Sequence, residues 1–495
     1  MTPLNITHVT SEFNPLAKAG GLADVVHGLA KQQVLNGNNV SVILPKYDLI
    51  NFTLVNPLEI YLQDLWTYQD NKANQNIVYK TIYEGINIFF IEPNKQRNYF
   101  NQGVIYGAEN DAERFLYFSR AAVEFLNHEN QPLNILHLHD WPTAVIAPLI
   151  KCMFRGLSGR INSIIFTIHN IEHQGRIHPN ELSRIGLYGA NLLTDPNKPE
   201  YLNLMKGGIA YADKVTTVSP TYAKEIKTPE FSFGLDKTID QYKDKLFGVI
   251  NGIEQESWNP ATDPHLFEPF PSNGTYIQDI LRKKDLNKQA LFKELGMNPS
   301  NGGPLVICIT RLASQKGPEL ILKAISLITR KGGCFILLGS ICEKNLEKPF
   351  NQAKEEFKNN PNVFLCYQFD NGLAHKLFAA ADAIFIPSKF EPCGLTQMIA
   401  MHYGTIPIAR NTGGLKDTIN DSTSKDPSGF LFDELSEVGV DKILDTAFNL
   451  YFYDKAKWQT MIQNGIGKDY SWKLPSISYE HIYRNEVLKQ QCSRN

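Results

Sequence analysis

The sequence predicts an α/β fold made of two doubly wound domains. Short β-rich apolar runs alternate with longer helical patterns along nearly the whole chain, the order typical of parallel sheets wrapped by helices. At 495 residues the chain is too long for one hydrophobic core, because single cores stop growing at roughly 250–300 residues. The tripeptide Gly-Gly-Leu also occurs twice, at 20–22 and 413–415, each time followed by one residue and an aspartate. Together these observations predict two similar halves.

The expected strands are distributed over both halves. They cover residues 6–10, 40–44, 86–91, 135–139, 163–168, 215–219, 305–310, 335–338, 363–367, 383–387 and 405–409. Several are apolar throughout, as strands buried on both faces of a parallel sheet should be. Residues 53–76 are polar and poorly patterned, so we expect a surface excursion there.

The domain boundary is expected after Asn251-Gly252, because the following stretch from Pro260 to Pro271 carries four prolines and few helix formers. This divides the chain into an N-terminal domain, 1–252, and a C-terminal domain, 253–471. A tail at 472–495 has aromatic and aliphatic residues at helical spacing, which predicts an ordered helix.

Composition excludes several classes of protein. A formal net charge of −2 provides no global basic field for nucleic acid or an anionic membrane. No apolar run reaches the length of about 18 residues that a membrane span needs, and no signal peptide is visible. Seven cysteines without a Cys-x-x-Cys spacing favour reduced thiols over a disulfide framework or a zinc site, so we expect a cytoplasmic protein.

The first Gly-Gly turn follows the first expected strand and begins with Lys18. Glycines there let the backbone approach a ligand, and the helix that follows offers unpaired N–H groups to an anion. An ordinary βα turn with a solvated lysine is an equally good interpretation of this motif alone. The chain lacks both the Gly-x-Gly-x-x-Gly and the Walker A patterns, which disfavours dinucleotide and P-loop sites.

Two loops of the second half point to a diphosphate and a sugar. Arg311 and Lys316 share a loop after the strand at 305–310, where open α/β sheets bind ligands, and a diphosphate suits both a guanidinium fork and a point charge. Two solvated cations are the less favoured alternative. After the strand at 383–387, Glu391 begins the run Glu-Pro-Cys-Gly-Leu-Thr-Gln. Glu391 could bind sugar hydroxyls, or it could only cap the next helix.

Histidines and an Asp-Trp pair end two strands of the first half. His137 and His139 precede Asp140-Trp141, and His169 follows the strand at 163–168. Metal binding is rejected for the first two, because alternate strand residues are more often packed and hydrogen-bonded and no third ligand is clear. Asp140-Trp141 suits a sugar, with a carboxylate for hydroxyls and an aromatic plate for the ring; a core tryptophan is the alternative.

Together these motifs resemble the bacterial glycogen synthases and plant starch synthases of glycosyltransferase family 5, over nearly the whole chain. The resemblance rests, in family order, on Lys18–Asp24, His137–Trp141, Thr167–Asn170, Asn251–Ile253, Arg311–Gly317, Glu391–Gln397 and Thr412–Leu415. It implies a GT-B architecture of two Rossmann-like domains, with the active cleft between them and a C-terminal helix that packs back on the first domain. It also implies transfer of glucose from ADP-glucose to the non-reducing end of an α-1,4-glucan, with retention of configuration.

The resemblance also implies roles for individual residues. Catalytic roles fall on Lys18, His169, Arg311, Lys316 and Glu391; donor binding on Gly20, Gly21, Asp24, Asn251, Tyr367, Cys393, Gly394, Leu395 and Thr396; and acceptor binding on Glu12, Asp140 and Trp141. No cofactor or metal is expected, and no Asp-x-Asp metal clamp occurs in the sequence.

The chemistry expected is electrostatic, because charge builds on the departing diphosphate and on an oxocarbenium-like sugar. No second carboxylate stands out as a hydrolase-type partner, so we expect same-face attack within an ion pair. Lys316, taken as a solvated cleft lysine, is expected to contribute little stability. A catalytically silent glucan-binding protein and a sucrose, trehalose or phosphorylase type of enzyme are the alternatives. The residues alone leave ADP-glucose against UDP-glucose open.

Overall fold

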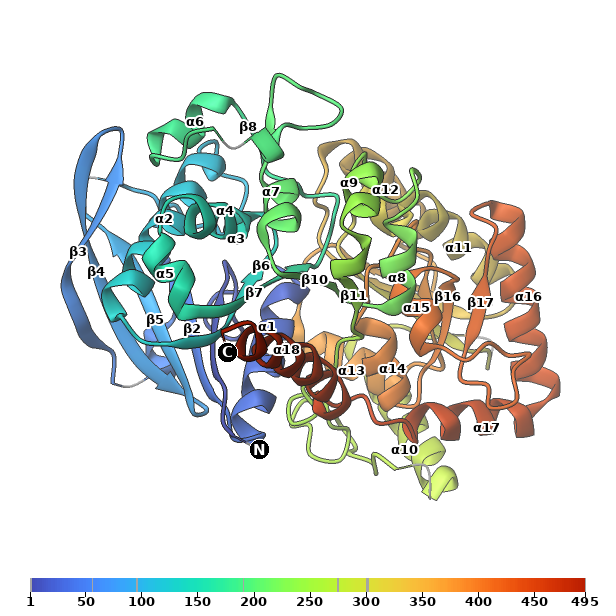
Figure 1. Cartoon of the computed structure of the whole chain (residues 1–495). Coiled ribbons are helices and arrows are strands. Elements are labelled where there is room, and N and C mark those ends of the chain that lie inside the picture. Colours follow the sequence, from blue (N-terminus) through green and yellow to red (C-terminus); the bar gives the residue numbers. More distant parts are fainter. Residues whose placement is uncertain are drawn as a thin grey trace. The chain divides into compact units, whose positions relative to one another are not determined.

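The computed structural model describes residues 2–55, 57–94, 97–189, 191–273, 276–299 and 302–494. The chain forms two compact units (Figure 1). The N-terminal unit comprises Met1–Gly252 with Trp472–Asn495, and the C-terminal unit comprises Ile253–Ser471.

The N-terminal unit is built on a sheet with the strand order β11-β10-β7-β6-β1-β2-β5-β4-β3. All neighbours are parallel except β3 with β4 and β4 with β5. The strands are β1 (Asn5–Val9), β2 (Asn39–Pro45), β3 (Glu59–Gln69), β4 (Lys72–Tyr83), β5 (Ile86–Pro93), β6 (Leu133–His139), β7 (Ile161–Ile168), β10 (Lys214–Thr217) and β11 (Leu246–Gly248); β8 (Arg176–Ile177) and β9 (Leu202–Asn203) form a separate short pair.

Helices cover both faces of this sheet. They are α1 (Gly21–Leu35), α2 (Asp111–Glu129), α3 (Trp141–Ala144), α4 (Ile146–Cys152), α5 (Arg155–Arg160), α6 (Pro179–Arg184), α7 (Leu204–Tyr211), α8 (Pro220–Glu225), α9 (Asp236–Gln241) and α18 (Lys473–Arg494), with 3₁₀ turns at Phe52–Leu54, Asn191–Leu193 and Lys243–Lys245. In Figure 1, α1 and α18 lie on one side of the central strands, and α2, α3, α4 and α7 lie on the other.

Helix α18 belongs to the core of the N-terminal unit although it ends the chain. Tyr479, Tyr483 and Val487 pack with residues of β1, α1, β6 and β7 in one buried cluster. The approach is close: a Cβ on Gly28 of α1 would lie 2.0 Å from Nε1 of Trp472. Glycine at this position therefore lets the segment before α18 dock on α1.

The C-terminal unit is built on a parallel sheet with the order β14-β13-β12-β15-β16-β17. Its strands are β12 (Leu305–Ile309), β13 (Cys334–Leu338), β14 (Val363–Cys366), β15 (Ala383–Ile386), β16 (Ile406–Arg410) and β17 (Phe430–Phe432). Its helices are α10 (Ile277–Glu294), α11 (Pro318–Arg330), α12 (Lys344–Phe357), α13 (Asn371–Ala380), α14 (Thr396–His402), α15 (Gly413–Thr418), α16 (Glu437–Tyr453) and α17 (Lys455–Ile466), with a 3₁₀ turn at Ser314–Lys316.

Both units share one topology, which confirms the predicted fold class. Numbered along the chain, the central strands of each unit run 3-2-1-4-5-6, the doubly wound order of dinucleotide-binding folds. The order reverses between β1 and β6 in the N-terminal unit, and between β12 and β15 in the C-terminal unit. Every expected strand is present, with each end within two residues of its predicted position.

The expectation of a surface excursion at 53–76 is wrong. Strands β3 and β4 occupy most of this segment and extend the sheet as an antiparallel hairpin. Their buried positions include polar residues such as Thr67 and Gln69. An edge hairpin keeps many side chains in water, so its hydrophobic alternation is weak and the segment does not read as strands.

Candidate functional site

The C-terminal unit places a charged cluster where its strand order reverses. Glu391 follows β15 and Lys316 follows β12, and the Lys316 ammonium lies 2.6 Å from Oε2 of Glu391. Ser388 donates a hydrogen bond of 2.8 Å to the same carboxylate oxygen. These three side chains and Thr396 line a small hollow at the carboxyl ends of β12 and β15. Open α/β sheets bind ligands at such a switch point.

The second Gly-Gly turn packs against the backbone of Glu391 and Cys393. Gly414 N–H donates to the carbonyl of Glu391 over 3.1 Å. A Cβ on Gly413 would lie 1.8 Å from that same carbonyl oxygen, and one on Gly414 would lie 2.1 Å from the carbonyl oxygen of Cys393. Only glycine allows the two backbones to approach this closely, so the turn positions Glu391 through backbone contact.

The loop of Lys316 is fastened to the loop of Glu391. The Gln315 amide donates to the carbonyl of Phe390, and Lys389 N–H donates to the carbonyl of Gln315. The side chains of Lys316 and Glu391 are only 18% and 9% exposed. The expectation that Lys316 is solvated is therefore wrong: it forms a half-buried ion pair, because the two loops meet at the switch point.

The other predicted residues of this unit differ in their surroundings. Arg311 is exposed, and no side chain of the described residues forms an ion pair with it. Tyr367 follows β14 and donates to the carbonyl of Phe350 over 2.6 Å. Cys393 is buried, Gly394 has a φ of +73°, and Leu395 is the N-cap residue of α14, which begins at Thr396. Glu391 does not cap this helix; its carboxylate contacts Ser388 and Lys316.

In the N-terminal unit, the loop after β1 folds around Glu12. The backbone N–H groups of Ala19 and Gly20 donate to Oε2 of Glu12 over 2.6 and 2.7 Å, and the Tyr106 hydroxyl donates to Oε1 over 2.9 Å. The turn that ends at Gly21, the first residue of α1, thus holds a carboxylate of its own chain. Glycine-turn amides suit an anion, and here that anion is Glu12.

Lys18 and Asp24 lie in the same segment and bind each other. The Lys18 ammonium donates to Oδ1 of Asp24 over 2.8 Å, and the two side chains are 45% and 27% exposed. Such a solvent-exposed pair contributes little stability, so either member can exchange its partner for a ligand at small cost. Asn251, at the end of this unit, has a buried Oδ1 with no hydrogen-bond partner among the described residues.

Asp140 connects the ends of β6 and β7. Its carboxylate accepts hydrogen bonds from the backbone N–H groups of His169 and Asn170 over 2.7 and 3.4 Å. Burial raises the pKa of Asp140 to about 7, against the lowering effect of these two donors. Asp140 also has a φ of 55°, a strained conformation for a non-glycine residue and one that concentrates at functional sites. The half-buried Trp141 indole packs edge-on against Phe115 at 5.3 Å.

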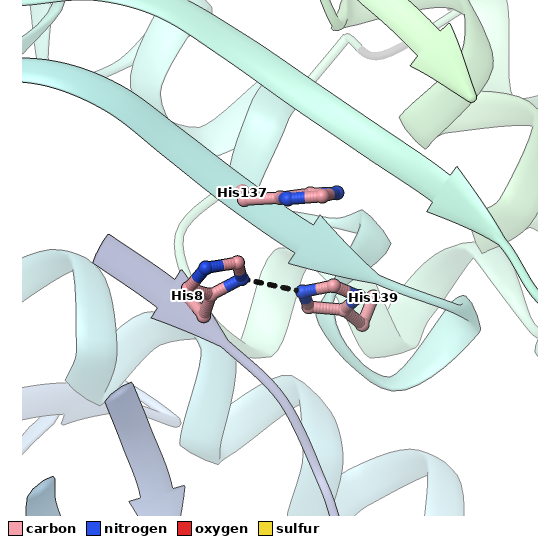
Figure 2. A group of neighbouring side chains, drawn as sticks. All are labelled: His8, His137 and His139. Atoms are coloured by element: carbon pink, nitrogen blue, oxygen red, sulfur yellow. Dashed lines mark hydrogen bonds between the residues drawn. The ribbon is translucent and has the colours of Figure 1, made fainter. Parts of the chain in front are cut away.

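The N-terminal unit has a cluster of buried histidines at β1 and β6, the strands between which its order reverses. His8 on β1 pairs in register with His137 on β6, and its Nδ1 lies 3.0 Å from Nε2 of His139 (Figure 2). His139 Nδ1 in turn lies 3.0 Å from Nε2 of His169. Ring nitrogens of His8, His137 and His139 all lie within 4.8 Å of one another, so the third metal-ligand candidate missed in the sequence is His8.

Sequence reasoning also missed the hydrogen-bond partners of these histidines. Gln33 of α1 contacts His8, and Tyr483 of α18 contacts His137. In the C-terminal unit, the hydrogen bond from Ser388 to Glu391 was missed as well. The only signal was a histidine at position 8 within an apolar strand. Pairing of β1 with β6 decides that it lies beside His137, and pairing is a property of the folded sheet.

Relatives of known function match both units. Residues 5–241 match the starch synthase catalytic domain family, and residues 293–448 match the glycosyl transferases group 1. A glycogen synthase from Protochlamydia amoebophila (strain UWE25) is 41% identical over 97% of this chain and 99% of its own length. Glycogen synthase 2 from Methylococcus capsulatus is 40% identical over 96% of this chain and 99% of its own.

Solved structures agree with this similarity. The catalytic domain of starch synthase IV from Arabidopsis thaliana, bound to ADP and acarbose, has a TM-score of 0.91 and 40% identity and covers 98% of this chain and 100% of that one. A sucrose-phosphate synthase from Thermosynechococcus elongatus shares the fold, with a TM-score of 0.60 and 15% identity over 97% of this chain and 98% of that one.

Fold and sites place the chain among glycosyltransferases with the GT-B-like arrangement of two Rossmann-like units. Within that class, the chain belongs to the glycogen and starch synthase family.

No helix in the described ranges has the length and hydropathy needed to cross a bilayer.

Proposed function

We propose that this chain transfers glucose from ADP-glucose to the non-reducing end of an α-1,4-glucan, with retention of configuration at the anomeric carbon. The glycogen synthases and the ADP- and acarbose-bound starch synthase that it resembles support this reaction. No metal or cofactor is part of the proposal. Six cysteines of the described residues are free thiols, which supports a reducing, cytoplasmic location.

The observation that carries the proposal is the charged cluster at the switch point of the C-terminal unit. Arg311 has an exposed guanidinium without an ion-pair partner in the described part of the chain, and Lys316 follows on the same loop. A leaving diphosphate gains negative charge, which these two cations neutralise. Glu391 accepts from Lys316 and from the Ser388 hydroxyl, and so holds the Lys316 ammonium in a fixed position; its orientation therefore costs little reorganisation during the reaction.

Donor binding is assigned to two sets of residues. Glu391, Cys393, Gly394, Leu395 and Thr396 are proposed to surround the glucose and phosphates through side chains and turn amides. Further donor contacts are proposed for Lys18, Gly20, Gly21, Asp24, Asn251, His169 and Tyr367.

Acceptor binding is assigned to Glu12, Asp140 and Trp141. Trp141 is half-buried, so part of its ring remains for a sugar face. The Glu12 carboxylate is fixed by the N–H groups of Ala19 and Gly20, and a second Asp140 oxygen remains beside the one held by His169 N–H. Fixed carboxylates of this kind orient glucan hydroxyls.

The chemical step proposed is attack by the glucan hydroxyl on the face that the diphosphate leaves. The glucosyl–oxygen bond to the phosphate breaks, the electron pair stays with the ADP, and the acceptor proton passes to the departing phosphate oxygen. Fixed cations beside the diphosphate and fixed dipoles beside the sugar lower the barrier. A covalent glycosyl-enzyme is not required, because the sugar cation and the diphosphate stay together as an ion pair.

A radiolabel transfer assay tests the proposal. ADP-glucose and UDP-glucose are offered separately to a glycogen primer, with wild type, Arg311→Met and the control Lys323→Met, an exposed lysine on α11. We expect transfer from ADP-glucose, a loss of about 10²–10³-fold in Arg311→Met and none in the control. Incorporation from UDP-glucose alone would overturn the donor assignment. Glucan binding without transfer from either donor would indicate a silent glucan-binding protein.

A further inference from the structure

A continuous series of hydrogen bonds leads from α1 to His169 through the interior of the N-terminal unit. Gln33 Oε1 lies 2.8 Å from Nε2 of His8. His8 Nδ1 lies 3.0 Å from Nε2 of His139, and His139 Nδ1 lies 3.0 Å from Nε2 of His169. Figure 2 shows the central bond between the His8 and His139 rings. His8 and His139 therefore use both ring nitrogens within this series.

A second series begins at the same glutamine. The Gln33 amide Nε2 donates to the Tyr483 hydroxyl over 3.3 Å, and that hydroxyl lies 2.7 Å from Nδ1 of His137. His137 Nε2 contacts the Thr167 hydroxyl, 2.5 Å away. Gln33, His137 and Tyr483 are fully buried, so these groups have no water to replace a lost partner.

All four histidines are neutral at physiological pH. Burial lowers the pKa of His8 to about 4 and that of His169 to about 3, and it holds the pKa values of His137 and His139 well below their ordinary value. A neutral imidazole has one N–H donor and one acceptor nitrogen. Each bond in the series therefore determines the direction of the next.

The direction is set at Gln33, because its amide has one acceptor end and one donor end. With Oε1 facing His8, the His8 proton lies on Nε2, and Nδ1 accepts from Nε2 of His139. His139 Nδ1 then accepts from Nε2 of His169. We propose that Gln33 is a positioning residue, which fixes the tautomer of His169 with its proton on Nε2 and leaves Nδ1 as a hydrogen-bond acceptor for a sugar hydroxyl.

The sugar part of this inference rests on the proposed function, and the tautomer part does not. None of the described residues forms a hydrogen bond to Nδ1 of His169, and His169 keeps 9% of its surface exposed. A hydroxyl that donates to Nδ1 gains electron density on its oxygen, which favours positive charge on the sugar. Turning the Gln33 amide would reverse both series together and make Nδ1 of His169 a donor.

Two near-isosteric variants test whether Gln33 fixes the tautomer of His169. Gln33→Met removes both ends of the amide, and Tyr483→Phe removes the acceptor that holds Nε2. Gln32→Met is the matched control, since the Gln32 amide donates to Asn36 on the exposed side of α1. Thermal unfolding of each variant reports whether the fold is retained.

Long-range ¹H–¹⁵N correlation spectra of protein labelled with ¹⁵N-histidine report which nitrogen of each ring carries the proton, and His169→Ala assigns the signal. We expect Nε2–H and a bare Nδ1 for His169 in wild type and in Gln32→Met. A tautomer mixture is expected in Gln33→Met and Tyr483→Phe. In a folded Gln33→Met protein, kcat should fall about tenfold with little change in KM for the donor.

Three results would overturn the inference. The first is an Nδ1 proton on His169 in wild type, and the second is an unchanged His169 spectrum in folded Gln33→Met and Tyr483→Phe. The third is stoichiometric binding of added Zn²⁺ that shifts His8, His137 and His139 together, because a metal site would use the same lone pairs. The spectra contain no sugar, so a wild-type protein that shows Nε2–H on His169 but transfers no glucose would refute the proposed function and leave the tautomer assignment standing.

Discussion

Replacing Lys316 by methionine separates its electrostatic role in catalysis from its role in the fold. The Lys316 ammonium lies 2.6 Å from Glu391, whose side chain is 9% exposed. Methionine keeps the length and most of the apolar contact of the lysine stem but removes the charge. The Glu391 carboxylate then retains the Ser388 hydroxyl as a donor and loses its countercharge.

The cost of this change follows from the burial of Glu391. A buried group left without one partner destabilises a protein by about 1–3 kcal/mol. Taking about 2 kcal/mol, and about 2–4 °C of Tm per kcal/mol for a unit of about 220 residues, the transition of the C-terminal unit should fall by about 4–8 °C. Loss of one fixed charge beside the leaving group should lower kcat about 10²–10³-fold.

Calorimetry and the transfer assay together check this prediction. The double variant Lys316→Met/Glu391→Gln should regain most of the lost Tm, since a neutral amide needs no countercharge, but it should not regain activity. Lys323→Met, exposed on α11, should change neither quantity. An unchanged Tm in Lys316→Met, or simple additivity in the double variant, would refute the ion-pair argument. Wild-type kcat in the single variant would refute the role in catalysis.

Two further predictions concern pH and a glycine. Because the folded-state pKa of His8 is about 4, the unfolded chain binds a proton that the folded one does not as pH falls below about 6.5. Urea unfolding at pH 5 should therefore show at least about 2 kcal/mol less stability than at pH 7, because His137, His139 and His169 have lowered pKa values and act in the same direction as His8. An Asp140→Asn background removes a carboxyl whose raised pKa acts in the opposite direction. Gly413→Ala should clash with the Glu391 carbonyl and lower both kcat and Tm, whereas the open site of Gly302→Ala should show no effect.

The alternation of apolar strands and helices was sufficient to predict the fold. Strands such as β13 and β15 are apolar throughout, because both of their faces are covered by helices. The hairpin of β3 and β4 was not predicted, because it lies at the edge of the sheet and is not covered in the same way. As an edge it presents polar residues to water, and Thr67 and Gln69 stand at its buried positions.

For the candidate site, the sequence predicted individual residues but not the contacts between them. Lys316 and Glu391 were identified from loops that follow strands, since a parallel sheet brings the loops after its strands to one edge. Their ion pair was not foreseen, because 75 residues separate them and only the adjacency of β12 and β15 brings them together. The sequence showed the second Gly-Gly turn as a repeat of the first; the structure shows that Gly413 and Gly414 contact the Glu391–Cys393 backbone.

The sequence by itself determined the fold class, the family and the residues with the right chemistry at strand ends, because these depend on local pattern and motif order. Only the tertiary structure decided which of them share protons and charges. Gln33, His8 and Tyr483 come from α1, β1 and α18, and 450 residues separate Gln33 from Tyr483. Their hydrogen bonds exist because sheet pairing and the docking of α18 exclude water around them, which no local pattern along the chain records.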